Sequence, residues 1–203
     1  MNVTQEQGRF RTWKVIASIF VTLDGVVEDP GGAEGFELGG WSFKYSGRSE
    51  EETAHAADLL RASDALLLGR ATYQGFAAAW PKMTDGGWYA EKMNAMRKYV
   101  VSSTMDKAEW TNTTIIRGNL AQEVTKLKEE KGQNLLVFGS AGLVNSLLQE
   151  HLLDELRLLV YPVVLGRGKR LFNEVPTVAL NVAGAKAFSS GVVLLTYQPA
   201  NQA

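Results

Sequence analysis

The strongest constraint on the fold is the order of segments along the first three quarters of the chain. Short apolar runs that predict buried strands are mostly followed by a turn and by a segment with helical spacing. Alternating strands and helices favour a parallel sheet covered by helices. The predicted strands are KVIASIFVTLDG at 14–25, ALLLGR at 65–70, KYVVS at 98–102, TTIIRG at 113–118 and NLLVF at 134–138.

The segments between these runs predict helices and one long loop. Ser49 and the acidic residues after it predict an N-capped helix, and a second helix from residue 71 is stopped by Pro81. A further helix runs to about residue 97, another lies between a cap at Asn119 and a stop at Gly132, and the last ends near residue 150. Residues 28–49 contain six glycines and predict a long ordered loop without a regular element.

The last quarter of the chain changes character. The segments 153–166, 177–188 and 191–198 predict strands without helices between them, and Pro162 indicates an interruption or bulge in the first. We therefore expect a three-layer α/β/α domain over residues 14–199, with a mostly parallel central sheet and antiparallel C-terminal strands. Residues 1–13 have no periodicity and predict a flexible N-terminal tail.

Composition excludes several function classes. The 203 residues include no cysteine, which removes disulfides, thiolate metal sites and cysteine nucleophiles. His55 and His151 have no matching carboxylate cluster, so no metal site is expected. A net charge of -1 without a basic cluster indicates neither nucleic acid nor a membrane surface as partner. With no signal peptide or membrane span, we expect a cytoplasmic protein.

Four predicted strands end in small or polar residues, in the segments TLDG, LGRATY, VSS and FGSAG. The carboxyl ends of parallel strands meet at one edge of a sheet, where ligands bind. The turn from Gly139 to Gly142 begins a helix whose free N–H groups favour phosphate, although G-x-x-G is less specific than the G-x-G-x-x-G dinucleotide fingerprint. Arg70 and Thr72 follow Gly69 at another helix start and predict an anion site; the alternative is an ordinary surface arginine.

These segments together resemble the dihydrofolate reductase-like superfamily, and within it the riboflavin-biosynthesis reductase (RibD C-terminal domain) family in its stand-alone bacterial form. The resemblance covers residues 14–198. The segments that carry it are SIFVTLDGVV, LLLGRATYQGF, YVVSST, LLVFGSAGLVNSLL and LLDELRLLVYPVVLGRGKRLF.

The resemblance implies NADPH as cofactor. It implies that Ala17 lines the nicotinamide. It also implies that residues at three of the strand ends bind the diphosphate and the adenosine 2'-phosphate. Arginine and hydroxyl donors gathered in one place fit the added phosphate of NADPH. The implied phosphate-binding residues are Gly69, Arg70, Thr72, Ser102, Ser103, Gly139, Ser140, Ala141, Gly142 and Leu143.

The resemblance also implies a substrate end near Asp24 and Gly25, with Trp41 in the long loop placed to stack on a flat heterocycle. The alternatives are that Asp24 is a turn aspartate and that Trp41 anchors the loop to the core. No catalytic residue is assigned. A proton donor among residues 50–52 would suit reduction of a C=N bond, but three acids there equally suit a helix N-terminus.

We therefore expect an NADPH-dependent reductase of a small pyrimidine- or pterin-like heterocycle, resembling 5-amino-6-(5-phosphoribosylamino)uracil reductase or dihydrofolate reductase. The alternative is a catalytically inactive NADP(H)-binding sensor or interaction module. The strand-rich end leaves an exposed sheet edge, and a homodimer is expected because two-fold dimers are the commonest oligomers.

Overall fold

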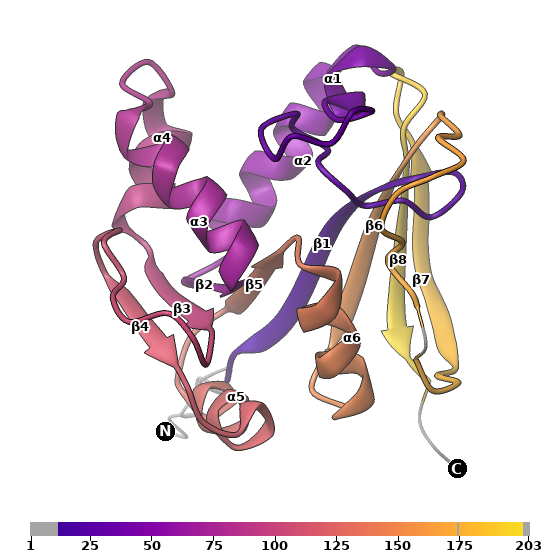
Figure 1. The fold of residues 1–203 in the computed structure, drawn as a ribbon. Coiled ribbons are helices and arrows are strands. Elements are labelled where there is room, and N and C mark those ends of the chain that lie inside the picture. Colours follow the sequence, from indigo (N-terminus) through magenta and orange to yellow (C-terminus); the bar gives the residue numbers. More distant parts are fainter. Residues whose placement is uncertain (1–11, 174, 201–203) are drawn as a thin grey trace, which may run out of the picture.

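The computed structural model of the protein describes residues 12–173 and 175–200, which form one eight-stranded sheet with helices on both faces (Figure 1). The strand order is β4-β3-β2-β5-β1-β6-β8-β7. The strands are β1 (Lys14–Thr22), β2 (Ala65–Gly69), β3 (Arg97–Val101), β4 (Thr113–Ile116), β5 (Asn134–Phe138), β6 (Glu155–Tyr161), β7 (Leu180–Ala187) and β8 (Val193–Pro199).

The first six strands in this order, from β4 to β6, run parallel to their neighbours. Beyond β6 the sheet continues with β8, which is antiparallel to β6, and with β7, which is antiparallel to β8. The expected three-layer α/β fold with antiparallel C-terminal strands is therefore confirmed. The helices are α1 (Trp41–Lys44), α2 (Glu50–Arg61), α3 (Arg70–Ala79), α4 (Gly87–Ala95), α5 (Leu120–Lys128) and α6 (Ala141–Gln149), with a 3₁₀ turn at Trp80–Lys82.

Alternating side chains of the central strands face two separate helix layers. Val15, Ala17 and Ile19 of β1 pack with apolar residues of α5 and α6, while Ile16 packs on the opposite face with residues of α2, α3 and α4. This two-residue alternation gives each face its own core. Among the described residues, no helix has the length and apolar character needed to cross a membrane.

The structure corrects two details of the expected elements and adds a third. The loop 28–49 contains the short helix α1. Strand β6 ends at Tyr161, directly before Pro162, so the interruption expected at that proline is present. A further irregularity, which the sequence did not predict, lies in β7 between Val182 and Gly184. Helix α5 ends at Lys128, four residues before Gly132. A side chain at Gly132 would collide with Trp13 Nε1 and the Asp64 carboxylate, so close packing explains that glycine.

Residues 1–11 of the expected tail lie outside the described residues, but its last residue belongs to the domain. Trp13 is 1% exposed and its backbone N–H donates to the Glu130 carbonyl at 3.2 Å. Its ring packs edge-on against Tyr99 at 6.2 Å, with the Arg97 guanidinium 4.6 Å from its centre. An aromatic ring of this size contributes to the core even without any periodic pattern around it.

Candidate functional site

The turns after β2 and β5 touch each other at the carboxyl edge of the sheet, because β2 and β5 are hydrogen-bonded neighbours. A Cβ added at Gly69 would lie 2.7 Å from the Ser140 Cβ and would also overlap Ser140 Oγ. A Cβ added at Gly139 would lie 3.1 Å from Thr72 Oγ1. Both glycines therefore permit an approach that larger residues would prevent. We call residues 69–72 and 139–143 the clamp.

Two helices begin at the clamp without side-chain caps. Gly69 is the N-cap of α3 and Ser140 the N-cap of α6, and neither supplies a side-chain hydrogen bond to the first turn. Ser140 adopts the left-handed conformation (φ 59°), which is uncommon for a residue with a side chain. The first-turn N–H groups of both helices carry partial positive charge, and an anion bound there would satisfy them.

A cavity of about 490 Å³ extends the clamp along the ends of β3 and β4. Arg70 reaches it, and its Nη1 donates to Thr104 Oγ1 at 3.2 Å. The cavity thus combines two guanidinium groups with hydroxyl groups, a donor set suited to a phosphate. Its lining comprises Arg70, Val101, Ser102, Ser103, Thr104, Ile116, Arg117 and Gly118.

The predicted serines and the unpredicted Arg117 have different positions in this cavity. Ser102 is 7% exposed, and its Oγ accepts hydrogen bonds from the N–H groups of Thr104 and Met105 at 3.3 and 3.1 Å, which orders the turn. Ser103 is exposed at the cavity. Arg117 donates through Nη2 to the carbonyl oxygens of Met105 and Asp106 at 2.7 and 2.9 Å. The signal for Arg117 was its place directly after a strand, in TTIIRG.

Ala17 lies apart from these residues, inside β1. It pairs with Val137 of β5 and Leu156 of β6, and its exposed fraction is 0%. Its side chain packs in the cluster on the α5 and α6 face. Its partner in β5, Val137, comes two residues before Gly139, so Ala17 lies below the edge where the clamp is formed. The structure therefore does not bring the Ala17 side chain to the open edge, and its contact with a nicotinamide stays a prediction.

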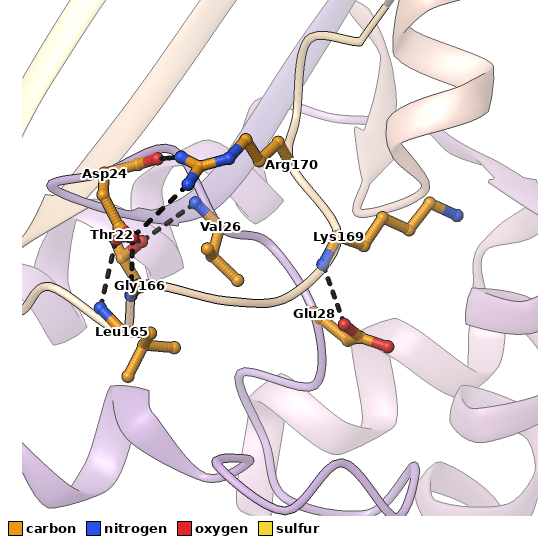
Figure 2. Close-up of polar contacts among 8 residues, drawn as sticks. All are labelled: Thr22, Asp24, Val26, Glu28, Leu165, Gly166, Lys169 and Arg170. Atoms are coloured by element: carbon orange, nitrogen blue, oxygen red, sulfur yellow. Dashed lines mark hydrogen bonds and ion pairs between the residues drawn. The ribbon is translucent and has the colours of Figure 1, made fainter.

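Asp24 joins the loop after β1 to the loop after β6 (Figure 2). Its Oδ1 accepts hydrogen bonds from Thr22 Oγ1 at 2.6 Å and from the Leu165 N–H at 3.2 Å, and its Oδ2 accepts one from the Gly166 N–H at 2.9 Å. Burial opposes ionisation, but these three hydrogen bonds together hold the pKa of Asp24 below its ordinary value. The geometry agrees with the turn-aspartate alternative, and substrate contact by Asp24 stays a prediction.

Further contacts extend this junction on both sides of Asp24. The Arg170 guanidinium donates to the Asp24 carbonyl oxygen, and the Lys169 N–H donates to Glu28 Oε2 at 2.8 Å (Figure 2). Gly25 has φ 86°, which glycine adopts without strain, and its carbonyl oxygen accepts from the Leu171 N–H at 2.9 Å. The loop after β1 and the loop after β6 are therefore joined by several hydrogen bonds.

Trp41 and the acids of α2 also have partners within the chain. Trp41 is 0% exposed, and its Nε1 donates to the Glu28 carbonyl at 2.7 Å, as the loop-anchoring alternative requires. Glu52 is 6% exposed and forms a capping box with Ser49. Glu51 accepts from the Ser189 N–H at 3.1 Å. Stacking by Trp41 on a heterocycle stays a prediction, although its ring has no free face in this structure.

A second cavity, of about 440 Å³, lies between the first turns of α6 and the loop after β6. Its lining contains two cationic and two carboxamide side chains beside the clamp glycine Gly142. The lining residues are Ala141, Gly142, Asn145, Gly168, Lys169, Arg170 and Asn173. Anionic groups are therefore favoured on both sides of the α6 N-terminus.

A family model for the RibD C-terminal domain matches residues 13–194, nearly the whole described chain. The chain belongs to the RibD C-terminal domain family. It is 30% identical over 188 residues to the uncharacterised protein YyaP of Bacillus subtilis (strain 168), covering 91% of this chain and 94% of YyaP. The sequence-based recognition of the family is thereby confirmed.

Two solved structures of other proteins share the fold. A putative riboflavin biosynthesis protein from Shewanella sp. PV-4 superimposes with a TM-score of 0.73 at 22% identity, covering 93% of this chain and 99% of that one. Dihydrofolate reductase from Enterococcus faecalis, solved in complex with NADP(H), gives a TM-score of 0.60 at 14% identity, covering 95% and 99%. At these identities the comparison establishes the dihydrofolate reductase-like fold.

Proposed function

We propose that the protein is an NADPH-dependent reductase of a small pyrimidine- or pterin-like heterocycle. The observation that carries the cofactor assignment is the clamp, where two glycine-permitted turns place two uncapped helix N-termini side by side. A diphosphate bridging these termini would satisfy N–H groups from both helices. The 2'-phosphate of NADPH would then occupy the adjoining cavity with Arg70 and Arg117.

The residues present fit this cofactor. Bound NADPH would supply the hydride, so the protein needs chiefly to orient the two reactants and keep water away. Gly69, Ser140 and the first turns of α3 and α6 would fix the diphosphate. Arg70 would fix the 2'-phosphate, because its guanidinium already lies in that cavity. The linked loops after β1 and β6 would shield the opposite end from solvent.

The test is selective loss of NADPH affinity in Arg70→Ala. We expect the dissociation constant for NADPH to rise about 10- to 100-fold, because a charge-assisted hydrogen bond is lost, while that for NADH changes less than about twofold. Arg61→Ala, which removes an exposed guanidinium from α2, is the matched control and should change neither constant. Calorimetric titration measures both. Equal losses for NADPH and NADH would show that Arg70 does not recognise the 2'-phosphate.

One observation favours a catalytically inactive NADP(H)-binding sensor as a second candidate. Asp24 and Glu52, the acids expected near the substrate end, both accept hydrogen bonds from their own chain. NADPH oxidation with dihydrofolate and with 5-amino-6-(5-phosphoribosylamino)uracil separates the two functions. Turnover of either heterocycle would exclude the sensor. NADPH binding without any turnover would favour it.

We also propose that the protein is a cytoplasmic homodimer. The sheet ends in two strands, β4 and β7, that each have one neighbour in the described chain. An unpaired edge of this kind can add a strand from a second copy. Light scattering at micromolar concentration tests the dimer, and a molar mass equal to that of one chain would refute it.

A further inference from the structure

Tyr161 is held rigidly at the carboxyl edge of the sheet. It is the last residue of β6 and pairs with Thr22, the last residue of β1. Its side chain is 4% exposed, with the Phe20 ring centre at 5.3 Å and the Trp41 ring centre at 5.2 Å. Two aromatic neighbours on a strand end leave the phenol little rotational freedom.

The Tyr161 hydroxyl lacks a partner within the described part of the chain. None of the hydrogen bonds among residues 12–173 and 175–200 involves it, and it is not one of the unpaired polar atoms sealed from solvent there. A tyrosine hydroxyl near the core normally finds a partner, because an unpaired donor costs free energy. The ring is therefore packed while the hydroxyl faces accessible space, as a ligand-binding phenol does.

Burial, together with the charges around this hydroxyl, keeps it protonated. Burial and the negative charge of Glu52 raise the pKa of the Tyr161 phenol, and the positive charge of Arg48 only partly opposes them. Glu52 is fixed because its Oε2 accepts from the Ser49 N–H at 3.0 Å, and Arg48 lies 5.5 Å from the Phe43 ring centre. Tyr161 is therefore a hydrogen-bond donor at any physiological pH.

Aromatic side chains extend from Tyr161 toward the clamp along one face of the sheet. Phe138 ends β5 directly before the clamp and pairs with Ser18, so Phe20, two residues further along β1, points to the same face. Phe76 of α3 packs against Phe138 at 6.2 Å. Phe20, Phe76 and Phe138 are all only partly buried. A flat ring would find apolar surface here between the clamp and the Tyr161 hydroxyl.

We propose that Tyr161 is a specificity-determining substrate residue, whose hydroxyl donates a hydrogen bond to a carbonyl oxygen or ring nitrogen of a planar heterocycle lying against Phe20 and Phe138. The inference rests on the proposed reductase function and refines its substrate class. The substrate must carry a hydrogen-bond acceptor on the ring edge that points away from the cofactor. Lactam carbonyls of pyrimidines and pterins meet this requirement.

Tyr161→Phe tests the proposal by removing one oxygen atom. Dihydrofolate and 5-amino-6-(5-phosphoribosylamino)uracil are titrated separately into protein saturated with NADP⁺, so that no turnover intervenes. We expect the dissociation constant of the bound heterocycle to rise about 5- to 10-fold in Tyr161→Phe, the effect of one neutral hydrogen bond. Tm and NADPH affinity should stay unchanged, because the hydroxyl has no partner within the described chain.

Tyr197→Phe is the matched control. Tyr197 lies in β8 and packs on the opposite face of the same sheet, so its hydroxyl should not affect heterocycle binding. Equal heterocycle affinity in wild type and Tyr161→Phe would overturn the inference, as would a Tm loss of several degrees in Tyr161→Phe. Wild-type protein that binds NADPH but neither heterocycle also overturns it. Tyr161-dependent heterocycle binding in a protein that does not bind NADPH would keep this inference and refute the proposed cofactor.

Discussion

Replacing Gly69 by alanine probes the contact between the two halves of the clamp. Gly69 has φ −75° and ψ 159°, which alanine adopts without strain, so the backbone itself should tolerate the change. The added methyl group, however, would lie 2.7 Å from the Ser140 Cβ. The only expected cost is therefore the collision between the two turns.

The size of that collision determines how much unfolding free energy Gly69→Ala should lose. Ordinary contact between such carbon atoms begins near 3.4 Å, so even after the Ser140 hydroxyl has rotated away from the new methyl group, the turns must separate by about 0.7 Å. Overpacking of this kind costs about 1–3 kcal/mol of unfolding free energy. For a chain of this length each kcal/mol lowers Tm by about 2–4 °C, which gives a loss of about 2–12 °C. NADPH affinity should fall as well, because the two helix N-termini move apart.

A double-mutant cycle with Ser140→Gly isolates the contact. Ser140→Gly removes the Cβ with which the new methyl group collides. Alone it should change the unfolding free energy little, because two effects oppose each other: glycine adopts the left-handed backbone of residue 140 (φ 59°) without strain, but it also gives the unfolded chain more conformational freedom. In Gly69→Ala/Ser140→Gly, the loss caused by alanine should largely disappear. Chemical denaturation of the four proteins measures the coupling. Strictly additive effects would refute the reasoning, because they would show that the two residues do not meet.

Three further predictions follow from single contacts. Asp24→Asn should weaken the junction of the two loops and speed hydrogen exchange of the Leu165 and Gly166 amides, measured by NMR; unchanged exchange would contradict the network. Trp41→Phe should lower the unfolding free energy by about 1–2 kcal/mol in urea, since the hydrogen bond to the Glu28 carbonyl is lost, and a change below about 0.3 kcal/mol would count against loop anchoring. Burial lowers the pKa of Lys98 to about 8, so between pH 8 and 10.5 the unfolded state binds more protons than the folded state, and the unfolding free energy rises with pH. The difference in unfolding free energy between wild type and Lys98→Met should therefore grow by about 2 kcal/mol from pH 8 to pH 10, measured by denaturation at each pH. Parallel pH profiles of the two proteins would disprove the lowered pKa.

The local patterns of the sequence predicted most of the elements and the positions of the two turns that meet after β2 and β5. Ser49 with an acid three residues later predicted a helix start, and the capping box is present. Gly69 and Gly139 each end an apolar strand, and the pairing of β2 with β5 brings the two turns together as the topology rule requires. These features depend on residues close in sequence or on general properties of parallel sheets.

The parts that the sequence could not predict depend on distant partners. Besides the hydroxyl of the neighbouring Thr22, Asp24 accepts hydrogen bonds from amides 141 and 142 residues away, which the sequence around Asp24 does not indicate. Trp13 is buried against Tyr99 and Arg97, two residues of β3, so its isolated position before β1 was misleading. The left-handed backbone of Ser140, which faces Gly69 of a different turn, likewise has no signal in a serine.

The position of β1 at the centre of the sheet has a consequence for synthesis of the chain. Both its neighbours are late in sequence, β5 at Asn134–Phe138 and β6 at Glu155–Tyr161. At about 5–20 residues per second, a nascent chain carries the unpaired apolar segment KVIASIFVT for roughly 6–25 s before its first partner has been translated. During this time the segment is a ready partner for a chaperone or for another nascent chain. Any molecule that requires both halves of the clamp can bind only after this delay, so its binding reports that β2 and β5 have paired.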